Sequence, residues 1–328
     1  MTVTIKDIAE KAEVSVSTVS KALNDNKRLK ESTRNRIKKI AQKLNYTPSG
    51  PAQALKKGKT NMIAVIVPRI NSIYYSALTQ AIKDQIKKAG YNLMLGSTNC
   101  DFEEEKKYVS LINSGQVDGA IFVTNFKEKL NNKLYENKIP VVNIGKVNSL
   151  NPQIPCVKSD LENIAYKLTN NLIENGLKEI AYVGKGGVKR KGFKKAMTDN
   201  SIAMMDSFNF KCEESFVRGK QIGEKLLNVN NLPKAIMCSN DELAIGIIQY
   251  LQNHGVDVSR EIAITGFDNI NMSQVCTPAL TTVDIPKRNL GQKAAELLLD
   301  LIKGRAIPDY ERIITYPAEI IKRESTSF

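Results

Sequence analysis

The chain has 328 residues, of which 42% are hydrophobic, and a formal net charge of +14 at pH 7, so we expect a globular protein with two or more packed domains. No apolar run approaches the roughly 18 residues that a membrane helix needs, and the basic N-terminus lacks the apolar core of a signal peptide, which together predict a cytoplasmic protein. The five cysteines lie far apart and form no Cys-x-x-Cys pair, which argues against a disulfide framework or a zinc site and predicts reduced thiols.

The first 60 residues carry most of the charge. They hold 14 Lys and Arg against 5 Asp and Glu, a net charge of +9. Basic segments are often only solvated surfaces, so charge alone decides little. Here apolar residues recur at helical spacing beneath the charge, which favours a small folded domain that binds the phosphate backbone of DNA.

Three helices are predicted in this segment. Residues Thr4 to Asp7 form a capping box that begins the first helix, and Ser15 caps a second helix after a turn at Glu13 and Val14. A third helix begins near Ser32. Two short helices across a tight turn indicate a helix-turn-helix, and the third closes its core. The residues expected in that core are Ile5, Ile8, Ala9, Ala12, Val19, Ala22, Leu23, Ile37, Ile40, Ala41 and Leu44.

The next segment, residues 48–60, has the composition of a linker. The stretch from Pro48 to Gly58 contains two prolines and two glycines among a few helix-forming residues. An isolated segment this short cannot hold a helix in water, because nucleation costs more than a few hydrogen bonds return. It can therefore act as a switch between an open tether and a helix.

From Met62 onward, short β-rich runs alternate with helical stretches, which predicts parallel α/β sheets. About 270 residues of alternating strands and helices are more than a single sheet usually accommodates, so we expect two Rossmann-like subdomains with a cleft between them. Ligands are then expected at the carboxyl ends of the strands. The predicted strands are 62–68, 91–97, 119–124, 141–145, 180–184, 235–239 and 262–266.

Catalytic motifs are poorly represented. His254 is the only histidine, so nucleophile activation by histidine and histidine-based metal sites lack a partner. No Gly-x-Gly-x-x-Gly follows the first predicted strand, which disfavours a dinucleotide cofactor. The loop 184–195 resembles a phosphate-binding loop, but Lys189 is followed by Arg190 instead of the Ser or Thr that would hold Mg²⁺. We therefore expect no enzyme, no cofactor and no metal.

Several motifs resemble those of the LacI/GalR family of bacterial repressors. The N-terminal ones are Ile5-Lys-Asp-Ile-Ala-Glu-Lys-Ala-Glu-Val-Ser-Val-Ser-Thr-Val-Ser-Lys-Ala-Leu-Asn24, Leu44-Asn-Tyr-Thr-Pro48 and Ala52-Gln-Ala-Leu55. The later ones are Ile63-Ala-Val-Ile-Val-Pro68, Val117-Asp-Gly119, Ser239-Asn-Asp-Glu242, Thr265-Gly-Phe-Asp268 and Leu280-Thr-Thr-Val283. The resemblance covers essentially the whole chain.

This resemblance implies a helix-turn-helix headpiece at 1–47, a hinge at 48–60 that becomes a helix on DNA, and an effector-binding and dimerisation core at 61–328. The core is expected to share the architecture of periplasmic binding proteins. Its implied subdomains are 61–160 plus 291–320, and 161–290. A homodimer is expected on a palindromic double-stranded operator, because one headpiece covers too few base pairs to be selective. The C-terminal tail has no heptads, so no tetramer zipper is evident.

The resemblance also implies which residues contact DNA. Val16, Ser17 and Lys21 are expected to read base edges in the major groove, while polar neighbours hold phosphates. Many family members carry Arg or His at the position of Lys21, so bidentate reading is lost here. The alternative is that these are ordinary solvated helix residues. The full implied set, with Leu55 inserting into the minor groove, is Thr4, Ser15, Val16, Ser17, Thr18, Ser20, Lys21, Asn24, Ala52 and Leu55.

The effector residues implied by the resemblance lie after predicted strands, where a cleft opens. Asp268 is expected to accept two hydrogen bonds from ligand hydroxyls, and Asn240 suits a sugar or nucleoside. The alternative for both is a helix cap or a turn. The basic residues after 184 suggest an anionic effector, or only a solvated face. The implied set is Tyr74, Asp160, Lys189, Arg190, Asn240 and Asp268.

Three functions remain open at this point. The first is a DNA-binding repressor of a carbohydrate-utilisation operon, controlled by a sugar, sugar phosphate or sugar acid in the cleft. The second is a global catabolite-type regulator whose corepressor is a phosphorylated carrier protein. The third is an enzyme with a basic N-terminal segment, which the missing catalytic motifs disfavour. The pair of Asp268 and Asn240 favours the first.

Overall fold

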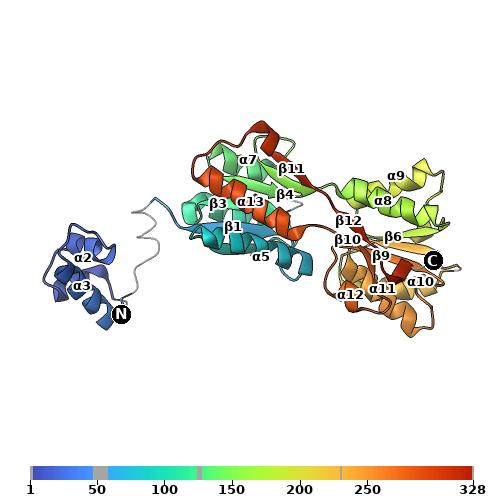
Figure 1. Ribbon diagram of the computed structural model, residues 1–328, viewed down its shortest axis with the longest axis horizontal. Helices are drawn as coiled ribbons and strands as arrows, with labels where there is room; N and C mark the ends of the chain where they lie inside the picture. The colour runs from blue at the N-terminus through green and yellow to red at the C-terminus, as the bar shows by residue number, and fades with distance from the viewer. Residues whose placement is uncertain (1–2, 47–57, 124–127, 230, 327–328) are drawn as a thin grey trace. The chain divides into compact units, whose positions relative to one another are not determined.

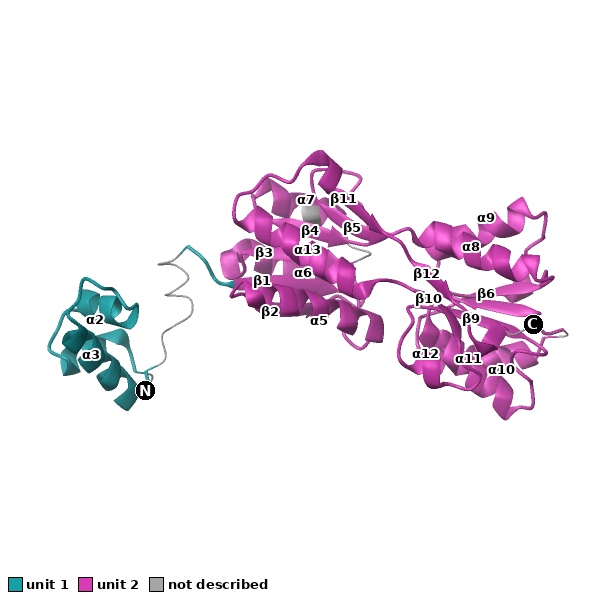
Figure 2. Ribbon diagram, in the orientation of Figure 1, with its two compact units in different colours: residues 1–61 teal, residues 62–328 magenta. Residues whose placement is uncertain are grey.

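A computed structural model describes residues 3–46, 58–123, 128–229 and 231–326 (Figure 1). The chain divides into two compact units, residues 1–61 and 62–328 (Figure 2). Most of the predicted hinge, including Ala52 and Leu55, lies outside the described residues. No helix in the described ranges is long and apolar enough to cross a membrane.

The N-terminal unit contains three helices, α1 (Ile5–Lys11), α2 (Val16–Leu23) and α3 (Glu31–Lys43). The backbone N–H of Thr4 donates to Asp7 Oδ2 at 2.7 Å, and the N–H of Thr18 donates to Ser15 Oγ at 3.3 Å. Both predicted helix starts are therefore stabilised as the sequence indicated. The core is formed mainly by the fully buried Ile8, Val19, Ala22 and Ile37, which confirms the helix-turn-helix.

The turn between α1 and α2 has an unusual backbone conformation. Glu13 has a φ of 50°, in the left-handed region where Gly and Asn are usual. The turn is supported by Arg36 of α3, whose Nη2 donates to Ala12 O at 2.9 Å. Lys30 stands at the N-cap of α3, and its side chain makes no capping hydrogen bond. The helices form despite both, because their apolar faces are buried against one another.

The C-terminal unit contains two six-stranded sheets, each with helices packed against it (Figure 1). Sheet A has the order β11-β5-β4-β3-β1-β2, and all of its strand pairs are parallel. Its strands are β1 (Met62–Val67), β2 (Asn92–Ser97), β3 (Gly119–Val123), β4 (Val141–Ile144), β5 (Cys156–Ser159) and β11 (Ile313–Tyr316). The helical segments of this subdomain are α5 (Ile73–Lys88), α6 (Phe102–Leu111), η1 (Ile112–Gln116), α7 (Glu128–Glu136), α13 (Lys287–Ile302) and η3 (Asp309–Glu311).

Sheet B has the order β12-β10-β9-β8-β6-β7, with only β12 antiparallel to its neighbour. Its strands are β6 (Ile180–Gly184), β7 (Asn209–Lys211), β8 (Ala235–Cys238), β9 (Ala263–Phe267), β10 (Thr281–Asp284) and β12 (Glu319–Ile321). The helical segments are α8 (Leu161–Glu174), α9 (Val188–Asp199), η2 (Asp206–Phe208), α10 (Phe216–Leu227), α11 (Asp241–Asn253), α12 (Met272–Val275) and η4 (Glu324–Thr326). The predicted two-subdomain α/β core is thus confirmed.

The chain passes between the two subdomains three times, after β5, after β10 and after β11. The resemblance described above implied that 291–320 belongs to the first subdomain. In the structure the returning segment begins with α13 at Lys287 and leaves sheet A after Tyr316, while Glu319–Ile321 pairs with β10 of sheet B. Each crossing lies near the carboxyl end of a strand, so all three border the space between the sheets.

Helix α13 packs closely on α5 and against sheet A. A Cβ built on Gly291 of α13 would lie 2.8 Å from Leu78 O of α5, so only a glycine allows this approach. Leu290, Ala294 and Leu298 on the same helix are buried. Helix α13 is therefore part of the sheet A subdomain.

Candidate functional site

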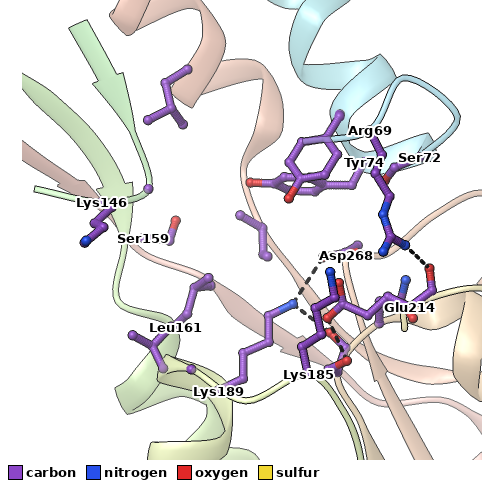
Figure 3. Close-up of a pocket in the computed structure, with 18 of the residues that line it drawn as sticks. Arg69, Ser72, Tyr74, Lys146, Ser159, Leu161, Lys185, Lys189, Glu214 and Asp268 are labelled. Carbon is purple, nitrogen blue, oxygen red and sulfur yellow. Dashed lines mark hydrogen bonds and ion pairs between the residues drawn. The ribbon is translucent and has the colours of Figure 1, made fainter. Parts of the chain in front are cut away.

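A cavity of about 620 Å³ lies between the two subdomains, at the carboxyl ends of the strands (Figure 3). Both subdomains contribute to its walls, as expected for two parallel sheets that face each other. Its polar and charged lining residues are Arg69, Ser72, Tyr74, Tyr75, Lys146, Ser159, Tyr182, Lys185, Lys189, Glu214, Ser239, Asn240 and Asp268.

Asp268, the residue after β9, is the buried carboxylate of the cavity and is 8% exposed. Its Oδ1 lies 3.7 Å from Nζ of Lys189, which reaches over from the first turn of α9 (Figure 3). The same ammonium donates to Ser239 O at 2.7 Å and lies 4.6 Å from the ring centroid of Phe267. Lys189 is thus held in front of Asp268 by three interactions.

The electrostatics of Asp268 follow from its burial. Burial raises the pKa of the Asp268 carboxyl, and the nearby Lys189 ammonium offsets part of that rise. Glu214, also in the cavity wall, raises the pKa further. A ligand that donates hydrogen bonds to the carboxylate would favour its ionised form, so this position is suited to hydroxyl or amine donors.

The backbone at Asp268 and Asn269 is unusual, because φ is 100° and 45° respectively. Such values are rare for residues with a side chain and persist only where the surroundings hold them. Nη2 of Arg323, a residue near the C-terminus, donates to Asn269 Oδ1 at 2.7 Å. Nη1 of the same guanidinium donates to Leu280 O at 2.7 Å and Ser273 Oγ at 3.1 Å, so it ties the turn to its neighbours.

A second buried carboxylate, that of Asp241, stabilises the turn through hydrogen bonds. Asp241, the first residue of α11, accepts from the Ile270 N–H at 2.9 Å and from Thr282 Oγ1 at 2.5 Å. Burial and the neighbouring Asp268 raise the pKa of Asp241 to about 7. Thr282 Oγ1 in turn accepts from the Asn269 N–H at 3.4 Å. Asp241 does not line the cavity, so it acts as a structural support for Asp268.

Asn240 combines the two roles that the sequence left open. It is the N-cap of α11, where its Oδ1 accepts from the Leu243 N–H at 3.0 Å. It also lines the cavity beside Asp268. Since the cap uses only the carbonyl oxygen, the amide nitrogen is available as a donor toward a bound molecule.

The opposite wall comes from the start of α5 and the end of β5. The rings of Tyr74 and Tyr75 pack edge to face with centroids 5.1 Å apart, and burial raises the pKa of Tyr74. Ser159 Oγ, at the end of β5, is buried and has no hydrogen-bond partner in the described part of the chain. Aromatic faces beside hydroxyl groups suit a compound with a flat face and several polar groups.

Two cations connect the subdomains at the edges of the cavity. Arg69, after β1, donates to Glu213 Oε1 at 3.2 Å, and Lys185, after β6, donates to Cys100 Sγ at 3.7 Å. Ser239 Oγ donates to Glu214 Oε1 at 2.8 Å on the same side. The cavity lining therefore includes four cationic side chains and two carboxylates. Two of the cations, Arg69 and Lys185, contact residues of the opposite subdomain.

On the N-terminal unit, the predicted base-reading face is accessible. Val16 is 41% exposed, and Ser17 and Lys21 are exposed along the same helix. Ser15 Oγ lies 2.9 Å from both Ser17 Oγ and Thr18 Oγ1. The remaining described residues of the set are also engaged locally. Thr4 is bonded to Asp7, and Asn24 Nδ2 donates to Ser20 O at 2.6 Å.

Comparison with known proteins decides the family. Residues 4–49 match the model for bacterial regulatory proteins of the lacI family, and residues 169–326 match the model for a periplasmic binding protein-like domain. Over 99% of its length the chain is 33% identical to "Catabolite control protein A" of Priestia megaterium, and the match covers all of that protein. The chain belongs to the lacI family. This lacI-family chain is also 32% identical to "Catabolite control protein A" of Staphylococcus aureus (strain N315), over 97% of its own length and 98% of that protein.

Solved structures agree with this assignment. The lacI-family chain is similar to a transcription regulator CcpA of Lactococcus lactis, with a TM-score of 0.72 and 28% identity over 81% of this chain and 99% of that one. A LacI-family regulator from Silicibacter pomeroyi gives a TM-score of 0.88 at 23% identity, over 99% of this chain and all of that one, which supports the fold alone. The protein is accordingly a DNA-binding transcription regulator.

The structure brings four of the six predicted effector residues of this lacI-family chain together, namely Tyr74, Lys189, Asn240 and Asp268. It does not bring Asp160 and Arg190 into the cavity wall. Asp160 is exposed and caps α8, accepting from the Asn163 N–H at 3.1 Å, and Arg190 follows Lys189 on α9.

Sequence reasoning missed several lining residues of this lacI-family site, among them Arg69, Ser159 and Glu214. Glu214 follows β7 and Ser159 ends β5, and neither strand was predicted. Arg69 does follow a predicted strand, β1 of sheet A, and lines the same cavity as the residues chosen after strands of sheet B. The position after a strand was therefore a signal that could have identified Arg69.

Proposed function

We propose that this protein is a homodimeric repressor of a carbohydrate-utilisation operon, and that a small sugar-like molecule in the cavity between the subdomains controls its binding to a palindromic operator. The observation that carries the proposal is the cavity itself. It places a buried carboxylate, an amide and two tyrosines around one space, in a chain whose family membership makes it a DNA-binding regulator.

The DNA-binding part of the proposal rests on the headpiece. The exposed Val16, Ser17 and Lys21 lie on the second helix of a helix-turn-helix, which enters the major groove in proteins of this kind. Val16 can contact a thymine methyl group, and Lys21 can reach guanine acceptors. The basic charge of the first 60 residues supplies phosphate contacts. For Ala52 and Leu55 the proposal rests on the sequence alone.

The homodimer is supported by the surface of the core. Large apolar side chains are exposed before and at the start of α5, on β2, at the start of α10 and on α12, and apolar surface of this kind is common at protein interfaces. They are Ile70, Ile73, Leu95, Phe216, Val217, Met272 and Val275. A dimer would double the number of base pairs that the two headpieces read.

The chemical class of the effector follows from the lining. Asp268, Asn240 and Ser159 offer acceptors and donors to hydroxyl groups, and Tyr74 offers an aromatic face. Of the four lining cations, Arg69, Lys146 and Lys189 pair with Glu213, Glu128 and Asp268 respectively, so an anionic group, as in a sugar phosphate or a sugar acid, would first be met by Lys185. Lys189 already contacts Asp268, so an anion would have to draw it away from that partner.

A second candidate is favoured by the relatives. The chain matches proteins named "Catabolite control protein A" over 97% to 99% of its length. On this reading the protein is a catabolite-type regulator, and a phosphorylated carrier protein that docks on the core surface acts as corepressor. Here the cavity would be secondary, and the docked protein would set operator affinity.

The two candidates are separated by one binding experiment. An operator is first selected from random duplexes with the full-length protein, and its affinity is measured by fluorescence anisotropy. We then expect a sugar, a sugar phosphate or a sugar acid to change the dissociation constant by roughly tenfold or more, as allosteric couplings usually do. A response to the phosphorylated carrier protein alone would favour the second candidate. The absence of any response would remove the proposed control through the cavity.

Lys21→Ala is expected to weaken binding to the selected operator by about 1–3 kcal/mol and to relax the preference at one base pair in each half-site. The reason is the loss of a side chain that reaches base acceptors from an exposed position on α2. Lys39→Ala, which removes an exposed lysine from α3, is the matched control and should affect operator and random DNA equally. Equal losses for Lys21→Ala on both DNAs would show that Lys21 contacts only the backbone.

A further inference from the structure

The turn that carries Asp268 is held almost entirely from within the sheet B subdomain. Arg323 binds the Asn269 side chain, Thr282 accepts from the Asn269 N–H, and Asp241 accepts from the next N–H along the chain. None of these three contacts involves the backbone carbonyl oxygen of Asp268. That oxygen accepts a hydrogen bond from a residue of the sheet A subdomain.

The partner is Lys287. Its Nζ donates to Asp268 O, and it also lies 3.4 Å from Asp284 Oδ1 at the end of β10. The Lys287 side chain is 17% exposed, so its ammonium is largely removed from water and depends on these two oxygens. Lys287 also favours the ionised form of Asp268, and so influences the carboxylate electrostatically as well as through the backbone.

Lys287 itself belongs to the other subdomain. It is the first residue of α13, which packs on α5 and sheet A through the close approach at Gly291. The start of α5 supplies Tyr74 to the opposite wall of the cavity. The hydrogen bond from Lys287 to Asp268 thus connects the Asp268 turn, in the sheet B wall of the cavity, to helices α13 and α5 of the sheet A subdomain.

We propose that Lys287 is the positioning residue that couples the Asp268 turn to the sheet A subdomain, so that a molecule bound at Asp268 changes the placement of α13. This inference rests on the proposed function in one respect, namely that Asp268 contacts the effector. The positive φ values of Asp268 and Asn269 make this turn suited to the role, because a ligand bound to the Asp268 carboxylate can shift the turn between discrete conformations. When the turn shifts, Lys287 either moves with the Asp268 carbonyl or loses its hydrogen bond to it.

The first test needs no ligand. Hydrogen exchange is measured by mass spectrometry on full-length wild type, Lys287→Met, Lys287→Arg and Lys293→Met. The reporters are the amides of Asn269 and Ile270 in the turn and of Leu290, which donates to Pro286 O in the first turn of α13. In Lys287→Met we expect exchange to rise about tenfold or more at both places, because each loses a shared support. Lys287→Arg should restore protection, since it keeps a cation.

Lys293→Met is the matched control. Lys293 lies on the same helix, is 28% exposed and pairs with Glu311 at 3.9 Å, away from the Asp268 turn, so its loss should leave both reporters unchanged. Unchanged exchange at the turn and at α13 in Lys287→Met would overturn the proposal. Should Lys287→Met fail to fold, Lys287→Gln, which keeps a neutral donor, is measured instead. Protection in Lys287→Gln equal to that of wild type would likewise contradict a role for the ammonium.

The second test measures the coupling itself. Glucose, glucose 6-phosphate and gluconate are titrated by calorimetry, and the effect of each on operator affinity is measured. With a probe that binds wild type, Lys287→Met is saturated with that probe, and the ratio of its operator affinities with and without probe should fall to about one, whatever its affinity for the probe. A full response in Lys287→Met would overturn the coupling. If none of the three binds wild type, the proposed effector class fails, whereas the exchange experiment still decides the link made by Lys287.

Discussion

Removal of residues 1–60 is expected to abolish operator binding and to leave ligand binding to the core intact. These 60 residues carry a net charge of +9 and include the exposed face of α2, while the unit from residue 62 onward has its own cores and both sheets. Loss of the phosphate contacts alone should cost several orders of magnitude in affinity, since full-length binding is expected to fall by roughly a thousandfold between low and physiological salt. Gel retardation and calorimetry on the truncated and full-length proteins measure the two effects.

The control for this truncation is the folding of the core, followed by circular dichroism and thermal unfolding. A folded core that still retards the operator would show that DNA contacts lie outside the headpiece, and the division at residue 61 would then have no functional meaning. A folded core that has lost ligand binding as well would show that the cavity depends on the headpiece.

Asp268→Ala is expected to weaken effector binding by about 2–4 kcal/mol, because it removes the buried carboxylate that we expect to accept two hydrogen bonds from the effector. Operator affinity without effector should stay nearly unchanged. Since burial raises the pKa of Asp268, wild-type affinity for a hydroxylated ligand should fall on acidification at a higher pH than an ordinary aspartate would give. Calorimetry at several pH values measures both.

Asp160→Asn is the matched control for Asp268→Ala, because it removes an exposed carboxylate but keeps the oxygen that caps α8. Lys189→Ala adds a second comparison and should cost a similar amount only if the effector is anionic. Unaltered effector affinity in Asp268→Ala would contradict the assignment of the cavity. Unaltered affinity in Lys189→Ala would contradict only the anionic class.

The parts of the fold that sequence reasoning predicted are those with strong local signals. The headpiece helices have caps at Thr4 and Ser15 and apolar residues at regular spacing, and they appear within one residue of the expected positions. Six of the seven predicted strands are buried runs of mainly apolar residues in parallel sheets, where such runs are diagnostic, and the seventh, β2, is the partly exposed edge strand of sheet A. Five strands were missed, namely β5, β7, β10, β11 and β12. Each has only three or four residues, among them polar or charged ones, so it lacks the uninterrupted apolar run that marks the equally short β8.

The candidate site divides in the same way. Asp268 and Asn240 stand directly after strands that could be predicted, so their meeting at one edge of sheet B follows from topology. The supports of the turn could not be predicted, because Arg323 and Thr282 come from segments 54 and 13 residues further along the chain. Nor does composition reveal the positive φ of Asp268, which depends on contacts made only in the folded core.

The two strands nearest the C-terminus, β11 and β12, have a consequence for synthesis of the protein. Strand β11 covers the edge of β5 in sheet A, and β12 covers the edge of β10 in sheet B. Until these last segments leave the ribosome, both sheets present an unpaired strand to other chains, whereas the headpiece, made first, can already be folded. Nascent or truncated chains that lack the final 20 or so residues should therefore be the species most prone to aggregate and most dependent on chaperones.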